Sequence, residues 1–260
     1  MPYPRQVAYV VQREHAESPV WLAEQAWKYG IAIINSSTVT TAMVAAVKKA
    51  LAPPQLVLVA ENTLDGMAMV HNGVQDIRRR PIVEQGLVPG WITGTTAGGI
   101  DIPGYVLRPP MAEPLADVDI LRVKELLANG LYVDQCFPRY PNWVRAQILA
   151  AKGGDAAAAQ FVSEAAEDFT EARMLFSRRI RTAGLSTWTL IVNCHNRNYD
   201  PSPTGISLES VPDPLTGLDA LIRAPYQTGA NIVWENSAPA SLAFLSQLPF
   251  VHIGINIPPP

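Results

Sequence analysis

The sequence is poor in cysteine and in charge. Among 260 residues there are two cysteines, and charged residues make up only 17%, below the quarter that is usual for soluble domains. Two cysteines cannot build a disulfide framework, which indicates synthesis in a reducing compartment. Because 48% of the residues are apolar, we expect a large core in a single domain that spans residues 1–260.

Other features that would define common classes are also missing. No signal-peptide core and no membrane-spanning apolar run is present, so we expect no membrane partner and a cytoplasmic or virion-associated location. The net charge is −3 and the only basic cluster is residues 78–80, so we expect no nucleic-acid partner. No glycine-rich phosphate fingerprint follows the first apolar run, which disfavours a dinucleotide-binding sheet.

Apolar runs alternate with helical patterns along the chain. We predict strands at 6–12, 31–35, 56–62, 105–108, 131–135, 187–195, 205–210, 231–237 and 250–256. We predict helices at 19–29, 41–51, 64–80, 114–128, 155–182, 215–226 and 239–248, with a hairpin arm near residues 91–96 and a loop at 137–143. This alternation favours an α/β fold with a parallel sheet, and at this length a (β/α)8 TIM-type barrel.

The strand count exceeds that of a barrel by one. The interval between residues 193 and 206 is also too short for an ordinary helical crossover. We therefore expect either that 205–210 or 250–256 lies outside the ring, or that a loop replaces the helix between the sixth and seventh strands. Since the chain ends just after the last strand, the final helix is expected to be absent. The apolar surface so exposed would suit a homo-oligomer or a larger assembly.

Polar residues stand at the ends of the predicted strands. They are Gln12, Asn35, Glu61, Arg108, Asp134, Asn193 with His195, Glu209, Glu235 and Asn256. In a barrel the carboxyl ends of the strands converge on one face, so we expect one net acidic pocket. Neighbouring carboxylates shift each other's pKa, so that one stays protonated while another is ionised. Cleavage of a glycosidic bond requires such a pair.

Asp134 is the leading candidate for the nucleophile or base, with capping of the following loop as its alternative role. Glu209 and Glu235 compete as the general acid. Substrate-binding roles are predicted for Glu61, Arg108, Asn193, His195, Tyr132 and Trp234, with a structural role as the alternative for Glu61. Trp91, Tyr140 and Trp143 are further aromatic residues that could stack on sugar rings, and simple packing is the alternative for each aromatic residue. Although His195 could bind a metal with Asp134 or Cys194, no ligand spacing supports this, and we predict no metal site.

The segment from Trp91 to Asp134 resembles TIM-barrel glycoside hydrolases similar to endo-α-1,4-polygalactosaminidases. In these proteins a Trp-containing hairpin precedes a strand, a helix and a strand that ends in Asp, here Gly130-Leu-Tyr-Val-Asp134. Two later segments also match, Leu190-Ile-Val-Asn193 and Gly205-Ile-Ser-Leu-Glu209. The resemblance implies a barrel in which Asp134 and Glu209 are catalytic. Gln135 stands where the family often has Asn, and the missing final helix is a second departure.

Three hypotheses follow from the sequence. The first is a cofactor-free glycoside hydrolase whose substrate is a polysaccharide or an oligosaccharide. The second is a non-catalytic, glycosidase-like barrel that serves as a structural or glycan-binding part of a larger assembly, such as a phage virion or tail. The third is a metal-dependent barrel hydrolase.

Overall fold

A computed structural model of the chain describes residues 5–10, 30–35, 39–53, 55–62, 70–71, 74–75, 78–95, 101–134, 142–183, 188–193, 205–209, 231–235 and 251–256. It describes the backbone alone for β1, β4, β5, β10, β11 and β12, and for residues 35, 62, 92–95, 101–103, 143 and 191–193. The predicted helices at 19–29, 215–226 and 239–248 lie outside the described residues.

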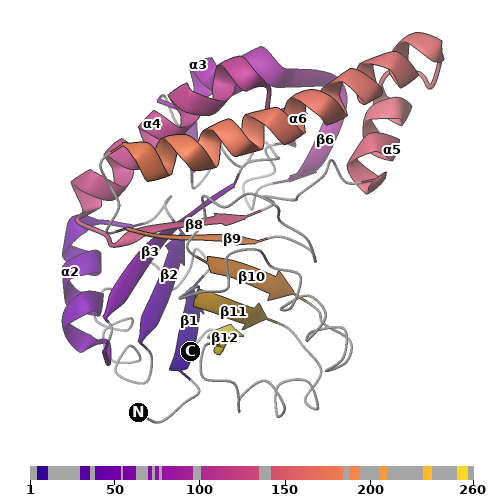
Figure 1. Ribbon diagram of the computed structural model, residues 1–260. Helices are drawn as coiled ribbons and strands as arrows, with labels where there is room; N and C mark the ends of the chain where they lie inside the picture. The colour runs from indigo at the N-terminus through magenta and orange to yellow at the C-terminus, as the bar shows by residue number, and fades with distance from the viewer. Residues whose placement is uncertain are drawn as a thin grey trace, which may run out of the picture.

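Eight parallel strands are hydrogen-bonded in a ring (Figure 1). In ring order they are β1 (Arg5–Val10), β12 (Val251–Asn256), β11 (Asn231–Glu235), β10 (Gly205–Glu209), β9 (Thr189–Asn193), β8 (Gly130–Asp134), β3 (Leu56–Asn62) and β2 (Ile31–Asn35), which pairs with β1. Following the residue register once around the ring leads back to β1 with a displacement of eight residues. That stagger, or shear, is the one that closes TIM barrels.

All eight ring strands fall on runs predicted as strands, and the ninth prediction is wrong. The run at 105–108 is not a ring strand, because β7 (Asp101–Tyr105) pairs antiparallel with β6 (Leu87–Thr95) in a separate two-stranded sheet. This pairing confirms the predicted hairpin. Since β10 and β12 both belong to the ring, the expectation that one of them lies outside it is also wrong. Residues 194–204, where a loop was the alternative to a helix, lie outside the described residues.

Local capping signals define several helices. The helix α2 (Thr41–Ala50) begins after Thr40, whose side chain accepts a hydrogen bond from the Met43 backbone amide at 3.2 Å. The longest helix, α6 (Ala156–Thr182), begins in the same way, since Asp155 Oδ1 accepts from the Ala158 amide at 2.8 Å. Such caps satisfy amides that have no partner within the helix, and both helices were predicted.

Other helical predictions need correction. Two prolines open α4 (Pro109–Leu126), five residues before the predicted start, because the fixed proline backbone suits a first helical turn. The predicted helix at 64–80 is wrong, since this region contains the antiparallel pair β4 (Val70–His71) and β5 (Val74–Gln75). Only α3 (Arg80–Val83) and a 3-10 turn, η2 (Glu84–Gly86), follow there. The predicted loop at 137–143 overlaps the start of α5 (Asn142–Ala151).

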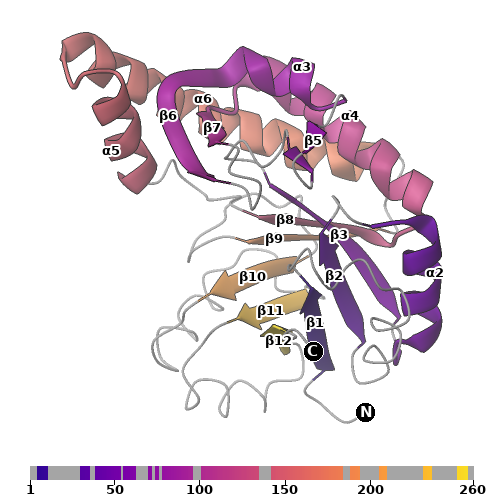
Figure 2. The ribbon, with the colours of Figure 1, turned by 180° about the vertical axis from the view of Figure 1, so that it is seen from behind.

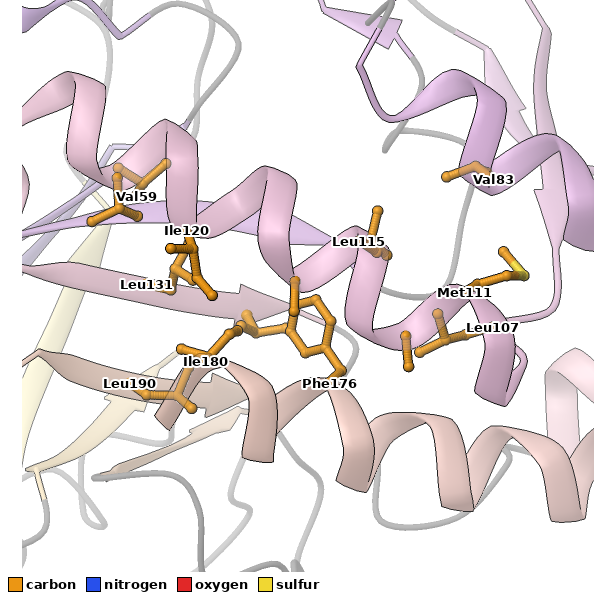
Figure 3. Packing of buried hydrophobic residues seen from close by; sticks show 14 of the residues in the cluster. Val59, Val83, Leu107, Met111, Leu115, Ile120, Leu131, Phe176, Ile180 and Leu190 are labelled. Atoms are coloured by element: carbon orange, nitrogen blue, oxygen red, sulfur yellow. The ribbon is translucent and has the colours of Figure 1, made fainter. Parts of the chain in front are cut away.

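Two helices cover one side of the ring. The helices α4 and α6 lie against each other and run across β8 and β9, while α2 flanks β2 and β3 (Figures 1 and 2). Between them lies the main core, where Ile120 of α4 and Phe176 and Ile180 of α6 meet Leu131 and Leu190 of the strands (Figure 3). This burial of apolar surface is the main favourable term that holds the helices on the sheet.

The two faces of each ring strand belong to different clusters. The outer face carries Val57, Val59, Leu131, Val133 and Leu190, which belong to the core beneath the helices. The inner face carries Ile31, Ile33, Leu58 and Tyr132, which form a separate buried cluster. Because successive residues of a strand point to opposite faces, the register assigns the other ring residues to the inner or the outer face.

Among the described helices, none is both long and apolar enough to cross a membrane.

Candidate active site

Asp134 lies at the carboxyl end of β8 and on the inner face of the ring. It follows Tyr132 by two residues, so it shares the face of that inward residue. The first four residues of β8 are buried, whereas Asp134 is partly exposed. A carboxylate at this position stands at the mouth of the barrel, above the apolar residues that fill its interior.

Glu209 and Glu235 are register partners at the ends of β10 and β11. Following the register from Tyr132 through Ile191 to Gly205 keeps to the inner face, and Glu209 lies four residues, an even number, beyond Gly205. Both glutamates are therefore on the same face as Asp134 and at the same end of the ring. Neighbouring strands lie about 4.8 Å apart, so the Cα atoms of the two glutamates are separated by roughly that distance.

Two asparagines occupy the inner face between and beside these acids. Asn193 ends β9, the strand between β8 and β10, and is the register partner of Ser207. Asn62 ends β3 and is the register partner of Asp134. Asn62 is not among the site residues that the sequence predicts. Its place one residue after Glu61 was a usable signal, since only one of two consecutive strand residues can face inward.

Glu61 lies on the outer face, away from the other acids. It is the register partner of Val133, and it is buried. Its Oε2 accepts a hydrogen bond from Nη1 of Arg79 at 2.8 Å, and Arg79 also contacts Asp119 of α4, with Nε and Oδ1 3.3 Å apart. The prediction that Glu61 binds substrate is therefore revised, and its structural alternative fits this placement.

Three other predicted binding residues lie elsewhere than expected. The Tyr132 side chain is fully buried inside the barrel, so its aromatic ring has no exposed face for a sugar. Trp234 is the register partner of Leu208 and precedes Glu235, which places it on the outer face. Arg108 precedes α4 outside the ring, and its guanidinium lies 3.8 Å from the Asp168 carboxylate and over the ring of Phe161. Alternation along each strand and the true strand boundaries account for these differences.

The β6–β7 hairpin and α5 stand on the side to which the carboxyl ends of β10 and β11 point (Figures 1 and 2). Trp91 of β6 is buried, and its Nε1 donates a hydrogen bond to Gln147 Oε1 of α5 at 2.8 Å. Gly104 of β7 lies so close to the Trp91 ring that a side chain would not fit. Trp91 therefore packs the hairpin against α5, which was the alternative to sugar stacking.

His195, Cys194 and Tyr140 lie outside the described residues, as does the side chain of Trp143. Among the residues that are described, no group of three or more His, Cys, Asp or Glu could hold a metal ion.

The ring, its shear and the polar ends of its strands define the class as an eight-stranded parallel α/β barrel of the TIM type. No protein-family model and no curated protein matches the chain. Among solved structures, it is similar to the glycoside hydrolase domain of PelA from Pseudomonas aeruginosa, with a TM-score of 0.55 and 15% identity over 96% of this chain and 94% of that one.

Two further solved structures share this fold. One is a GH18 chitinase from Pseudoalteromonas aurantia, with a TM-score of 0.53 and 10% identity over 96% of this chain and 93% of that one. The other is a GH31 α-xylosidase from Xanthomonas citri, with a TM-score of 0.56 and 9% identity over 97% of this chain and 32% of that one. At these identities the likeness shows a fold that glycoside hydrolases use.

Proposed function

We propose that this protein is a glycoside hydrolase that cleaves a polysaccharide or an oligosaccharide by a two-carboxylate mechanism, with residues 1–260 forming one barrel domain. The observation that carries the proposal is the common place of Asp134, Glu209 and Glu235 on the inner face at the carboxyl ends of ring strands. In TIM-barrel enzymes this end of the ring holds the active site. The similarity to glycoside hydrolase structures supports the same chemistry.

The spacing of the strands favours Asp134 and Glu209 as the reacting pair. Glu209 lies two strands from Asp134 and two residues farther along the register, which is about 10 Å across the sheet and about 7 Å along it. Retaining and inverting enzymes use carboxyl separations of roughly 5–9.5 Å, which an aspartate and a glutamate on backbones this far apart are long enough to reach. Glu235 is one strand farther away.

We assign the roles from charge and position. Asp134 acts as nucleophile or base, and Glu209 as the general acid that protonates the leaving oxygen. Glu235, one strand spacing from Glu209, is the alternative general acid. Asn193 and Asn62 donate hydrogen bonds to sugar hydroxyl groups. The reaction needs no cofactor.

The test is the release of reducing ends by the purified chain from a panel of polysaccharides. The panel includes α-1,4-linked galactosamine polymers, because of the resemblance to polygalactosaminidases, and chitin oligosaccharides, because one similar structure is a chitinase. We expect Asp134→Asn and Glu209→Gln each to lower kcat at least about 100-fold. Glu171→Gln, an exposed change on α6, is the matched control and should leave kcat unchanged.

The same assay separates the other hypotheses. Full activity of Asp134→Asn would show that this assignment is wrong. Binding of a glycan without its cleavage would favour the non-catalytic barrel, and loss of activity after dialysis against a chelator would favour the metal-dependent hydrolase.

A further inference from the structure

A buried ion cluster, formed by Glu61, Arg79 and Asp119, ties the end of β3 to α4. The Arg79 guanidinium contacts both carboxylates, at 2.8 Å to Glu61 and 3.3 Å to Asp119. The exposed fractions of the three side chains are 2% for Arg79, 4% for Glu61 and 1% for Asp119. Arg79 directly precedes α3, and α3 packs against α4 (Figure 2). Three separate segments therefore meet at one guanidinium.

Stability alone is a weak reason for such a cluster. Two carboxylates and one guanidinium lose their hydration on burial, and well-packed apolar side chains often give equal or greater stability. What an ion cluster adds is direction, because the planar guanidinium forms its hydrogen bonds along fixed lines. The cluster therefore fixes where the end of β3 stands relative to α4.

The place of the cluster connects it with Asp134. Glu61 is the register partner of Val133, and the next pair along the ladder joins Asn62 to Asp134. Moreover, Asp119 belongs to α4, which ends at Leu126, only a few residues before β8 begins at Gly130. Arg79 thus holds the end of β3 to the helix that leads into the strand of Asp134.

The opposite end of the same strand pair is held in another way. Asn129, which directly precedes β8, accepts a hydrogen bond at Oδ1 from the Val57 amide at 3.0 Å. The backbone amide of Asn129 donates to the Val57 carbonyl oxygen at 2.8 Å. Hydrogen bonds of one asparagine therefore align the amino ends of β3 and β8, and the ion cluster lies at their carboxyl ends.

We propose that Arg79, through Glu61 and Asp119, is a positioning residue that sets the height and the direction of Asp134 at the barrel mouth. This inference rests on the proposed catalytic role of Asp134. Arg79 is buried on the outer side of the ring and acts through β3 and β8. A displacement of about 1 Å at a reacting group is enough to lower a rate about 100-fold.

The test uses a variant without charges, Glu61→Gln with Arg79→Met and Asp119→Asn, because removing Arg79 alone would take the compensating positive charge away from two buried carboxylates. Asn129→Ala is the matched control, since it weakens the amino end of the same strand pair. We expect the charge-free variant to fold and to lose about 100-fold in kcat, with KM changed less than about threefold. Arg79→Lys keeps the positive charge but lacks the planar guanidinium donors. Its kcat should lie between that of the charge-free variant and that of the wild type. The control should keep the kcat of the wild type.

Hydrogen exchange measured on the same proteins does not depend on activity. We expect the amides of residues 60–62 and 131–134 to exchange faster in the charge-free variant, and those near residues 56–58 to exchange faster in Asn129→Ala. If the wild type cleaves no glycan, the proposed function fails, and faster exchange confined to the carboxyl ends still supports the positioning role. Unchanged exchange there, or a wild-type kcat in the charge-free variant, would overturn the inference.

Discussion

Gly130 opens the strand that carries Asp134, and we expect Gly130→Ala to destabilise the barrel strongly. A Cβ atom at this position would overlap the Thr189 carbonyl oxygen and would lie 2.8 Å from its carbonyl carbon and 2.9 Å from its nitrogen. Ordinary contacts of a carbon atom are about 3.5–4.0 Å long. The overlap can be relieved only if β8 and β9 move apart at their first residue pair, by roughly 1.5 Å.

This movement breaks at least one backbone hydrogen bond at the start of β8. Thr189 donates its amide hydrogen to the Asn129 carbonyl oxygen at 3.0 Å, and a separation near 4 Å is no longer a hydrogen bond. Losing one or two buried backbone hydrogen bonds costs about 1–3 kcal/mol, and the positive φ of 155° adds about 1–2 kcal/mol for alanine. We expect a total of about 2–5 kcal/mol, or a Tm about 10 °C lower.

The assay is urea unfolding of Gly130→Ala beside Gly153→Ala. Gly153 also has a positive φ, of 87°, but a Cβ atom there would have nothing within 4 Å. The control therefore carries the cost of backbone strain without the steric overlap, and we expect it to lose only about 1 kcal/mol. If Gly130→Ala lost no more than Gly153→Ala, the steric argument would be refuted.

Two further predictions concern the carboxyl end of α4. Leu127 has a left-handed backbone, with φ of 56°, and is 66% exposed. Leu127→Gly should therefore raise the free energy of unfolding by about 0.5–1 kcal/mol. A lower stability of this variant in urea unfolding would contradict the prediction. A hydrogen bond from Arg78 lowers the pKa of the Glu125 carboxyl from 4.5. The folded-state pKa thus lies below the unfolded value, so this contact stabilises the protein above about pH 4.5 and its contribution is lost as the pH falls through the folded value. We expect a small Tm difference between the wild type and Glu125→Gln at pH 7 that vanishes at low pH; a difference that persisted there would contradict the assignment.

Much of the ring could be predicted from sequence because buried parallel strands are continuous apolar runs with clear limits. The run Leu56–Val59 and the run Leu131–Val133 are examples, and both became ring strands. Capping residues also carried local information, as Asp155 did for α6. Local signals failed where the element was short, so the region at 64–80 was predicted as a helix although it contains β4 and β5.

The catalytic candidates show the limit of the same reasoning. Glu61, Asp134, Glu209 and Glu235 all follow apolar runs, and nothing within each run tells which face its last residue occupies. The face depends on which strand lies beside it and in what register, and a shift of one residue reverses every side chain. In the structure, the register places Asp134, Glu209 and Glu235 on the inner face and Glu61 on the outer face.

Local sequence is sufficient to predict α/β elements whose strands end in acids and amides, because hydrophobic patterning and capping act over a few residues. That eight of those strands close with a stagger of eight residues, and that Glu61 lies on the outer face and pairs with Arg79, follows from the tertiary structure. The physical reason is that a closed ring and a buried ion pair both join residues far apart in the chain, and their geometry exists only once those residues have met.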